Sequence, residues 1–147
     1  MLNEMERERK IAQHLFYVSL KYTKTGDVIL NLLIRWEKVI DKGIEIMLKK
    51  AKKAKKISEI PVAPRAKELA VRGAYKDEIV HKIMDLYNLF RKIPTLEKIC
   101  EHEFRKNVTV KIITQGYEMD INIDKLKEWN ELIEKFVLYI THVAKSK

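Results

Sequence analysis

The sequence has few of the residues that cross-link or interrupt a chain. Its 147 residues include one cysteine, three prolines and four glycines. A single cysteine, Cys100, cannot form a disulfide within the chain, so stability must come from packing. The scarcity of proline and glycine predicts long regular elements rather than disorder. The chain also has no Cys-x-x-Cys pair and no glycine-rich loop. These absences argue against the common structural zinc sites and the common phosphate-binding loops.

Long apolar runs are missing as well. No run approaches the roughly 20 apolar residues that a membrane-spanning helix needs. The first ten residues, MLNEMERERK, are charged and lack the apolar core of a signal peptide. The sequence therefore predicts a soluble cytoplasmic protein without a membrane partner.

Charge is what the sequence has in abundance. Charged residues make up 35% of the chain, and the formal net charge is +9. The 46% hydrophobic content suffices for one core, so we expect a single helical domain over residues 1–147. The positive charge favours phosphate-bearing partners, RNA or DNA, although charge also serves solubility. The surplus of lysine and glutamate is a composition found in thermophilic proteins.

Apolar residues recur at helical spacing through most of the chain. The predicted helices cover residues 3–22, 28–54, 65–72, 76–92 and 96–105, and a last one begins near residue 124. Thr25 or Asp27 is expected to cap the second helix, and Asp124 is expected to cap the last. Gly73 is expected to end the short helix before it.

The period changes to two in the stretch NVTVKIITQGYEMDINID, residues 107–124. A two-residue turn at Gln115–Gly116 would pair Thr114 with Tyr117 and place the apolar residues of both strands on one face. The register follows as Ile112 with Met119, Lys111 with Asp120, and Val110 with Ile121. The predicted fold is therefore mainly α: an up-down helical bundle with a C-terminal β-hairpin over about 108–123, followed by a long final helix.

The stretch from Lys49 to Lys56 reads KKAKKAKK, and it permits two interpretations. It can be the solvated end of the second helix, where lysines face the negative end of the helix dipole. It can also be a surface that contacts phosphates, and the two interpretations are compatible. The candidate nucleic-acid-binding residues are Lys49, Lys50, Lys52, Lys53, Lys55, Lys56 and Arg65. Lysines point to phosphate contact rather than base reading, in which arginine leads.

Candidates for chemistry are few. Glu78 and His81 have the Glu-x-x-His spacing of di-iron bundles, but only one copy is present, so a surface pair is the expected role and no metal or cofactor is predicted. Cys100 and His102 stand two residues apart, a spacing that points two side chains in different directions on a helix. Cys100 is therefore expected to pack as a small hydrophobe. Tyr75 is the one aromatic residue expected to be exposed among basic residues.

Two segments resemble a known family. The segments HLFYVSLKYTKTGDVILNLLIRWEKVIDKGIEIMLKKA (residues 14–51) and IVHKIMDLYNLFRKI (residues 79–93), joined by a proline-containing linker, resemble HEPN domains. The likeness covers roughly residues 11–93. It implies a small helical bundle that dimerises. Active HEPN proteins are metal-independent RNases with an Arg, four to six residues and then a His, and Arg9 and His14 have this spacing.

Three hypotheses about function follow. The first is a non-enzymatic HEPN-like binding or scaffold module, homodimeric, with a basic patch for RNA or DNA. It is preferred because the Arg9–His14 pair lies on the first helix, whereas the family's motif lies late in its bundle. The second is a metal-independent RNase that uses Arg9 and His14. The third is a protein-interaction module with no nucleic-acid role.

Overall fold

The computed structural model describes residues 1–146 and is mainly α-helical, with one small sheet. The first helical stretch combines α1 (Leu2–His14), a π-helical turn η1 (Leu15–Ser19) and α2 (Leu20–Tyr22). The remaining helices are α3 (Gly26–Lys53), α4 (Pro64–Ala74), α5 (Glu78–Lys92), the 3-10 turn η2 (Ile93–Thr95) and α6 (Ile123–Lys145). The strands are β1 (Glu97–Glu101), β2 (Thr109–Thr114) and β3 (Tyr117–Ile121).

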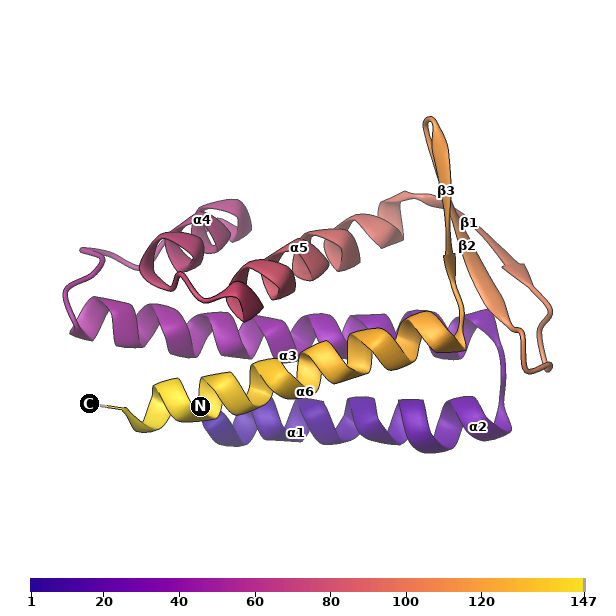
Figure 1. Cartoon of the computed structure of the whole chain (residues 1–147), viewed down its shortest axis with the longest axis horizontal. Helices are drawn as coiled ribbons and strands as arrows, with labels where there is room; N and C mark the ends of the chain where they lie inside the picture. Colours follow the sequence, from indigo (N-terminus) through magenta and orange to yellow (C-terminus); the bar gives the residue numbers. More distant parts are fainter. Residues whose placement is uncertain (147) are drawn as a thin grey trace.

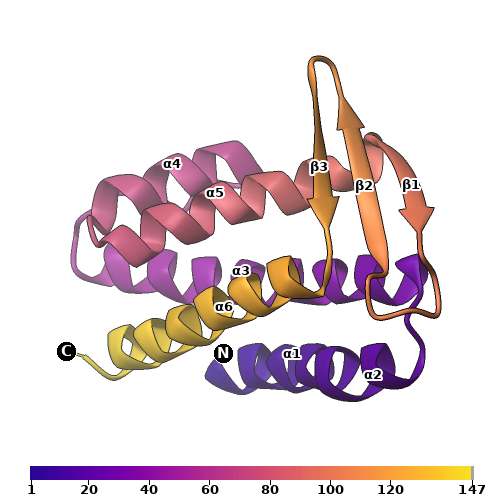
Figure 2. The same cartoon turned by 45° about the vertical axis from the view of Figure 1, so that its right-hand side comes forward.

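The longest helix, α3, is the axis of the molecule. It contacts α1, α4, α5 and α6. In Figures 1 and 2, α1 lies on one side of α3 and the α4–α5 pair lies on the other. The sheet stands at the end where α3 begins, and the chain ends at the opposite end, where α3 terminates (Figure 1). Within residues 1–146, none of the helices combines the length and the apolar character that crossing a bilayer requires.

The core follows the predicted apolar stripes. On α3 the side chains of Ile29, Leu32, Trp36, Val39, Ile40 and Met47 are buried, as are Leu126, Trp129, Ile133, Phe136, Val137 and Ile140 on α6. Aromatic rings connect the helices through the centre. The ring of Trp36 lies 6.2 Å from the rings of both Phe16 and Phe90, and Phe90 lies 5.4 Å from Trp129, between centroids. One apolar cluster thus contains residues from α1, α3, α5, α6 and the sheet.

The sheet confirms the predicted register of the hairpin but contains a strand where a helix was predicted. Strands β2 and β3 pair Thr114 with Tyr117, Lys111 with Asp120 and Val110 with Ile121, as expected. The helix predicted over residues 96–105 is wrong, because Glu97–Glu101 forms β1 and pairs with the other edge of β2. The result is a three-stranded antiparallel sheet in the order β1-β2-β3 rather than a lone hairpin. Pairing with an open strand edge has overridden a weak local helix preference.

Three predicted helix boundaries also need correction. Gly73 does not end its helix, since α4 continues to Ala74. The helix expected to begin near residue 76 begins at Glu78. The cap of α6 is Asn122 rather than Asp124: the Asn122 side chain accepts a hydrogen bond from the backbone N–H of Lys125 at 2.9 Å. At the start of α3, Thr25 is the cap and accepts from the N–H of Val28 at 3.4 Å.

Candidate nucleic-acid interface

The lysine-rich stretch is the end of α3, as one of its two interpretations predicted. The helix reaches Lys53, and the chain then leaves it through a left-handed residue, Lys55, with φ 60°. The N–H of Lys56 donates to the carbonyl of Ala51 at 2.8 Å, and the N–H of Lys55 donates to that of Lys52 at 3.0 Å. This pair of bonds is a Schellman motif, which satisfies carbonyls that would otherwise lack partners at a helix end. The last turn of α3 is therefore fixed rather than frayed.

The six lysines of this stretch, Lys49, Lys50, Lys52, Lys53, Lys55 and Lys56, form what we call the lysine cluster. All are exposed except Lys50, which is half-buried and donates from Nζ to the backbone carbonyl of Ser146 at 2.6 Å. In the part of the chain that the structure describes, no carboxylate lies within 4.0 Å of any of the six ammonium groups. The cluster therefore carries positive charge that no direct ion pair with residues 1–146 offsets.

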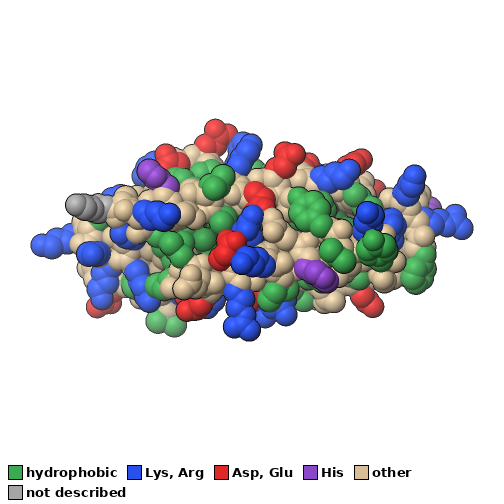
Figure 3. Space-filling view, turned by 90° about the horizontal axis from the view of Figure 1, so that it is seen from below, with side chains coloured by type: hydrophobic (Ala, Val, Ile, Leu, Met, Phe, Trp, Pro, Cys, Tyr) green, Lys and Arg blue, Asp and Glu red, His purple; other side chains and the backbone are tan. Residues whose placement is uncertain are grey.

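Two neighbouring hollows lie beside the lysine cluster, and Lys50 and Lys53 border both. One hollow, of about 230 Å³, is lined by Met1, Leu2, Ile46, Lys49, Lys50, Lys53 and Ala144. The other, of about 380 Å³, is lined by Lys50, Lys53, Ala54, Lys56, Tyr75, Val143 and Ser146. Figure 3 shows Lys and Arg side chains bordering a hydrophobic area near this end of the molecule. The cluster thus borders concave surface with an apolar floor.

The structure divides the predicted patch. Lys49, Lys50, Lys53 and Lys56 line the hollows, whereas Lys52 and Lys55 line neither. Arg65 does not join them: it lies at the start of α4, where its Nη1 is 4.0 Å from Oε2 of the buried Glu68, and it lines another hollow with Asn88, Arg91 and Lys92. On α3, Lys53 shares a face with Lys49 and Lys50, because residues three or four apart lie on the same side of a helix. Lys56 lies beyond the end of α3 and reaches the second hollow from the segment that follows the helix.

Arg9 and His14, the candidate residues of the RNase hypothesis, have different surroundings. Arg9 is held by two carboxylates: its Nε and Nη2 donate to the two oxygens of Glu134 at 2.6 and 3.0 Å, and its Nη1 donates to Glu6 at 2.6 Å. These contacts raise the pKa of Arg9, with the bond from Glu134 as the largest cause. His14 is exposed on the same helix, where five residues correspond to a rotation of about 140°. Arg9 therefore links α1 to α6.

Glu78 and His81, the weak candidates for a metal site, each contact a different basic residue. Glu78 forms an ion pair with Lys82 at 3.1 Å, and Nδ1 of His81 lies 3.4 Å from Nη1 of Arg72. No group of three or more His, Cys, Asp or Glu side chains within residues 1–146 is arranged to hold a metal ion.

Cys100 is on a strand rather than on the predicted helix, and the residue is exposed. Its thiol lies against Gly26. This partial burial, with the carboxylates of Glu103 and Asp27, raises the thiol pKa. A raised pKa disfavours the thiolate that a catalytic cysteine needs.

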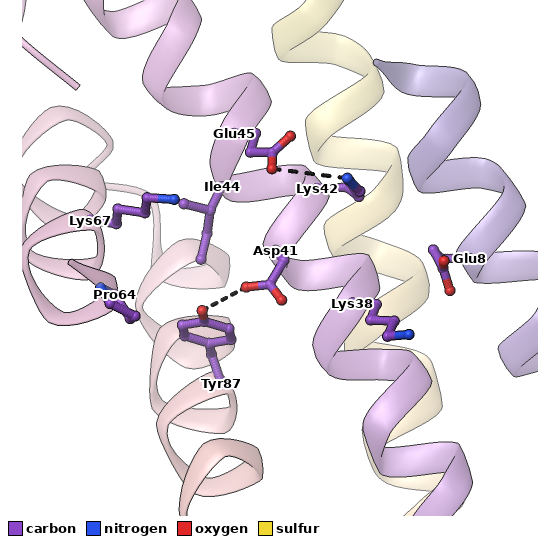
Figure 4. Close-up of a pocket in the computed structure, with 9 residues that line it drawn as sticks. All are labelled: Glu8, Lys38, Asp41, Lys42, Ile44, Glu45, Pro64, Lys67 and Tyr87. Atoms are coloured by element: carbon purple, nitrogen blue, oxygen red, sulfur yellow. Dashed lines mark hydrogen bonds and ion pairs between the residues drawn. The ribbon is translucent and has the colours of Figure 1, made fainter. Parts of the chain in front are cut away.

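One pair of interacting residues in a surface hollow was not predicted. A hollow of about 490 Å³ between α1, α3, α4 and α5 contains Asp41, which accepts a hydrogen bond from the hydroxyl of Tyr87 at 2.6 Å (Figure 4). Burial is the main cause that raises the pKa of Asp41, and burial and this bond also raise that of Tyr87. Both lysines and carboxylates line the hollow, so its charges largely offset one another. No sequence signal links Asp41 to a partner 46 residues away.

Comparison with known proteins gives no identification. The chain matches no protein-family model, no curated protein and no solved structure. The function is therefore argued from the residues of this chain, and the lysine cluster is the feature with the clearest chemical preference.

Proposed function

We propose that the protein is a non-enzymatic nucleic-acid-binding module of HEPN-like build, acting as a homodimer, that contacts phosphates through its lysine cluster. The observation that supports this most is the set of six lysines at one end of α3, none of which has a carboxylate of residues 1–146 within 4.0 Å. Such a cluster attracts a polyanion and releases its counterions on binding. Ammonium groups supply phosphate contacts without reading base edges, so binding is expected to be insensitive to sequence.

The contacts of Arg9 favour nucleic-acid binding over RNA cleavage as the function. Arg9 donates three of its five N–H groups to Glu134 and Glu6, so two carboxylates offset its charge and compete with a phosphate for its guanidinium group. An RNase that used Arg9 and His14 would first have to break this network. We expect labelled RNA to stay intact when incubated with the protein without metal. Cleavage that His14→Ala abolishes would favour the RNase hypothesis instead.

The test of the interface uses two variants with the same loss of charge. Lys49, Lys53 and Lys56 are changed together to glutamine in one variant. In the control variant, Lys10, Lys127 and Lys135 are changed instead; these are exposed lysines on α1 and α6 without ion pairs in residues 1–146. Fluorescence polarisation measures the affinity of each protein for a labelled single-stranded RNA over a series of salt concentrations.

The expected result is a change in salt dependence for one variant alone. Each phosphate contact on a single strand contributes about 0.7 to the slope of log affinity against log salt, so the cluster variant should lose about 2 from this slope. The control variant should keep most of the wild-type slope. If both variants lost the same amount of slope, RNA binding would depend on the net charge of the protein and not on the lysine cluster. No binding by the wild-type protein at low salt would leave the protein-interaction hypothesis.

A further inference from the structure

Tyr75 is the aromatic residue that the fold places beside the lysine cluster. It follows α4 with an extended backbone, and its hydroxyl donates to the backbone carbonyl of Met47 on α3 at 2.8 Å. This bond connects residues 28 positions apart and fixes the ring against the last turns of α3. The ring is half-buried and lines the 380 Å³ hollow together with Lys50, Lys53 and Lys56.

One face of the Tyr75 ring is covered by a side chain that can move. Nζ of Lys56 lies 5.0 Å from the ring centroid, a cation–π arrangement. Lys56 is exposed, and its ammonium group has only the carbonyl of Ala74, at 3.5 Å, as a hydrogen-bond partner in the described residues. If Lys56 turned towards a phosphate, this face of the ring would be open to a flat ligand from solvent.

An aromatic ring in a lysine-lined hollow is better suited to a single-stranded nucleic acid than to a duplex. Every nucleobase has a face that can stack on an aromatic side chain, and this stacking tolerates any sequence. In a duplex the base faces are covered by their neighbours, whereas a single strand can turn a base outwards. A purely electrostatic surface would not distinguish the two forms in this way.

We propose that the hollow beside Tyr75 takes one base of a single-stranded nucleic acid. The base stacks on the ring of Tyr75, and the flanking phosphates contact Lys50, Lys53 and Lys56. This inference rests on the proposed function and adds to it a preference for single strands. Lys56 has two positions in this account: over the ring in the free protein, and on a phosphate in the complex.

The test compares three tyrosine variants. Tyr75→Leu removes the ring, and Tyr75→Phe keeps the ring but not the hydroxyl. Tyr22→Leu is the matched control: Tyr22 is exposed and has Nζ of Lys21 at 5.8 Å from its ring centroid, but it lies at the end of α2, away from the lysine cluster. Affinities for a labelled single strand and for the duplex of the same sequence are measured at one low salt concentration. Thermal melts followed by circular dichroism check that each variant folds.

The expected result is a loss specific to Tyr75→Leu and to the single strand. Its affinity for the single strand should fall roughly tenfold, the loss expected for one stacked base. Its affinity for the duplex should stay within about twofold of the wild-type value. The folded Tyr22→Leu and Tyr75→Phe variants should bind both the single strand and the duplex within about twofold of wild type. Equal losses for single strand and duplex, or no loss, would overturn the stacking inference. The variant with glutamine at Lys49, Lys53 and Lys56 tests the proposed function separately, because it should bind both the single strand and the duplex more weakly. If it does so while Tyr75→Leu shows no selective loss, only the stacking inference fails.

A second measurement uses the unmodified protein and so does not depend on the stability of a variant. A single strand that contains 5-iodouracil is irradiated in complex with the protein, and the cross-linked residue is identified by mass spectrometry. A cross-link at Tyr75 supports the inference. Cross-links found only at other residues contradict it.

Discussion

At the residue scale, Lys55 adopts a backbone conformation that a lysine rarely holds. Its φ of 60° lies in the left-handed region, where the Schellman motif at the end of α3 requires it. Glycine adopts this region without a steric penalty from Cβ. The lysine at this position therefore costs folding free energy.

The variant Lys55→Gly should raise the free energy of unfolding by roughly 0.5 to 1 kcal/mol, since the relief of strain exceeds the entropic cost of glycine. Lys52→Gly, three residues earlier in the last turn of α3, should lower it by at most about 1 kcal/mol, because glycine is a poor helix former. Urea denaturation of both variants measures these values. If the two variants changed stability in the same direction, the described end of α3 would be wrong.

Asp41 gives a residue-scale prediction about pH. Burial raises the pKa of its carboxyl group above the ordinary value of 3.8, although the bond from Tyr87 partly opposes this. The folded protein then holds the Asp41 proton more tightly than the unfolded chain does. Its contribution to stability is thus present at low pH and is lost as the pH rises from about 4 through the raised pKa.

The variant Asp41→Asn has no charge to bury at this position and keeps a side-chain oxygen that can accept from Tyr87. Its stability relative to wild type should therefore increase as the pH rises from about 4 to 7. Urea denaturation at several pH values follows this difference. A difference between the two proteins that stayed constant with pH would show that Asp41 ionises as easily in the folded protein as in the unfolded chain.

At the element scale, the approach of α6 to α3 depends on Gly43. A Cβ atom at this position would lie 2.6 Å from both Cε2 and Cζ of Phe136, whose ring is fully buried. Neither the ring nor the packed helices can move away cheaply, because the interior is close-packed. Gly73 on α4 is the opposite case, since a Cβ atom there would meet no atom within 4 Å.

The variant Gly43→Ala should lower the free energy of unfolding by about 1 to 3 kcal/mol, the range for an overpacked core. Gly73→Ala should raise it by about 0.5 to 1 kcal/mol, because alanine is the better helix former and the site has room. Thermal or urea denaturation measures both. A neutral Gly43→Ala variant would contradict the close packing of α3 and α6.

The elements also show what the sequence could predict. The hairpin register followed from alternation alone, because a shift by one residue would have turned its apolar residues to solvent. Strand β1 was missed because Glu97–Glu101 has too few apolar residues to show a period of two. Its strand state depends on pairing with β2, a contact between segments that no local pattern encodes. The cap at Asn122 was missed because Asp124, two residues on, is an equally good capping residue by type.

At the scale of the whole molecule, charge is distributed unevenly along the long axis. The lysine cluster lies at the end where α3 terminates, and the sheet, with carboxylates that pair with Lys111, lies at the end where α3 begins (Figures 1 and 2). Charge clustered at one end concentrates a polyanion there and increases its rate of encounter. The protein is therefore expected to meet nucleic acid end-on.

The lysines of the candidate site could be identified from the sequence, but the hollows beside them could not. The run of lysines is visible in the sequence, whereas the absence of carboxylates of residues 1–146 within 4.0 Å of them is known only from the fold. The hollows are not visible, because they depend on contacts such as that of Lys50 with Ser146, 96 positions later, and that of Tyr75 with Met47. Tyr75 was expected to be exposed among basic residues, but it is half-buried, and only the fold shows which lysines surround it.

The central claim is that nucleic acid binds at the lysine cluster, and chemical-shift mapping tests it most directly. The backbone amide signals of the isotope-labelled protein are followed by NMR as a single-stranded oligonucleotide is added at low salt. The account predicts that the largest shifts fall on residues 49–56, on Tyr75 and on residues 143–146, while the strands of the sheet stay unchanged. Shifts concentrated on the sheet or around Arg9 and His14, or no shifts at all, would contradict it.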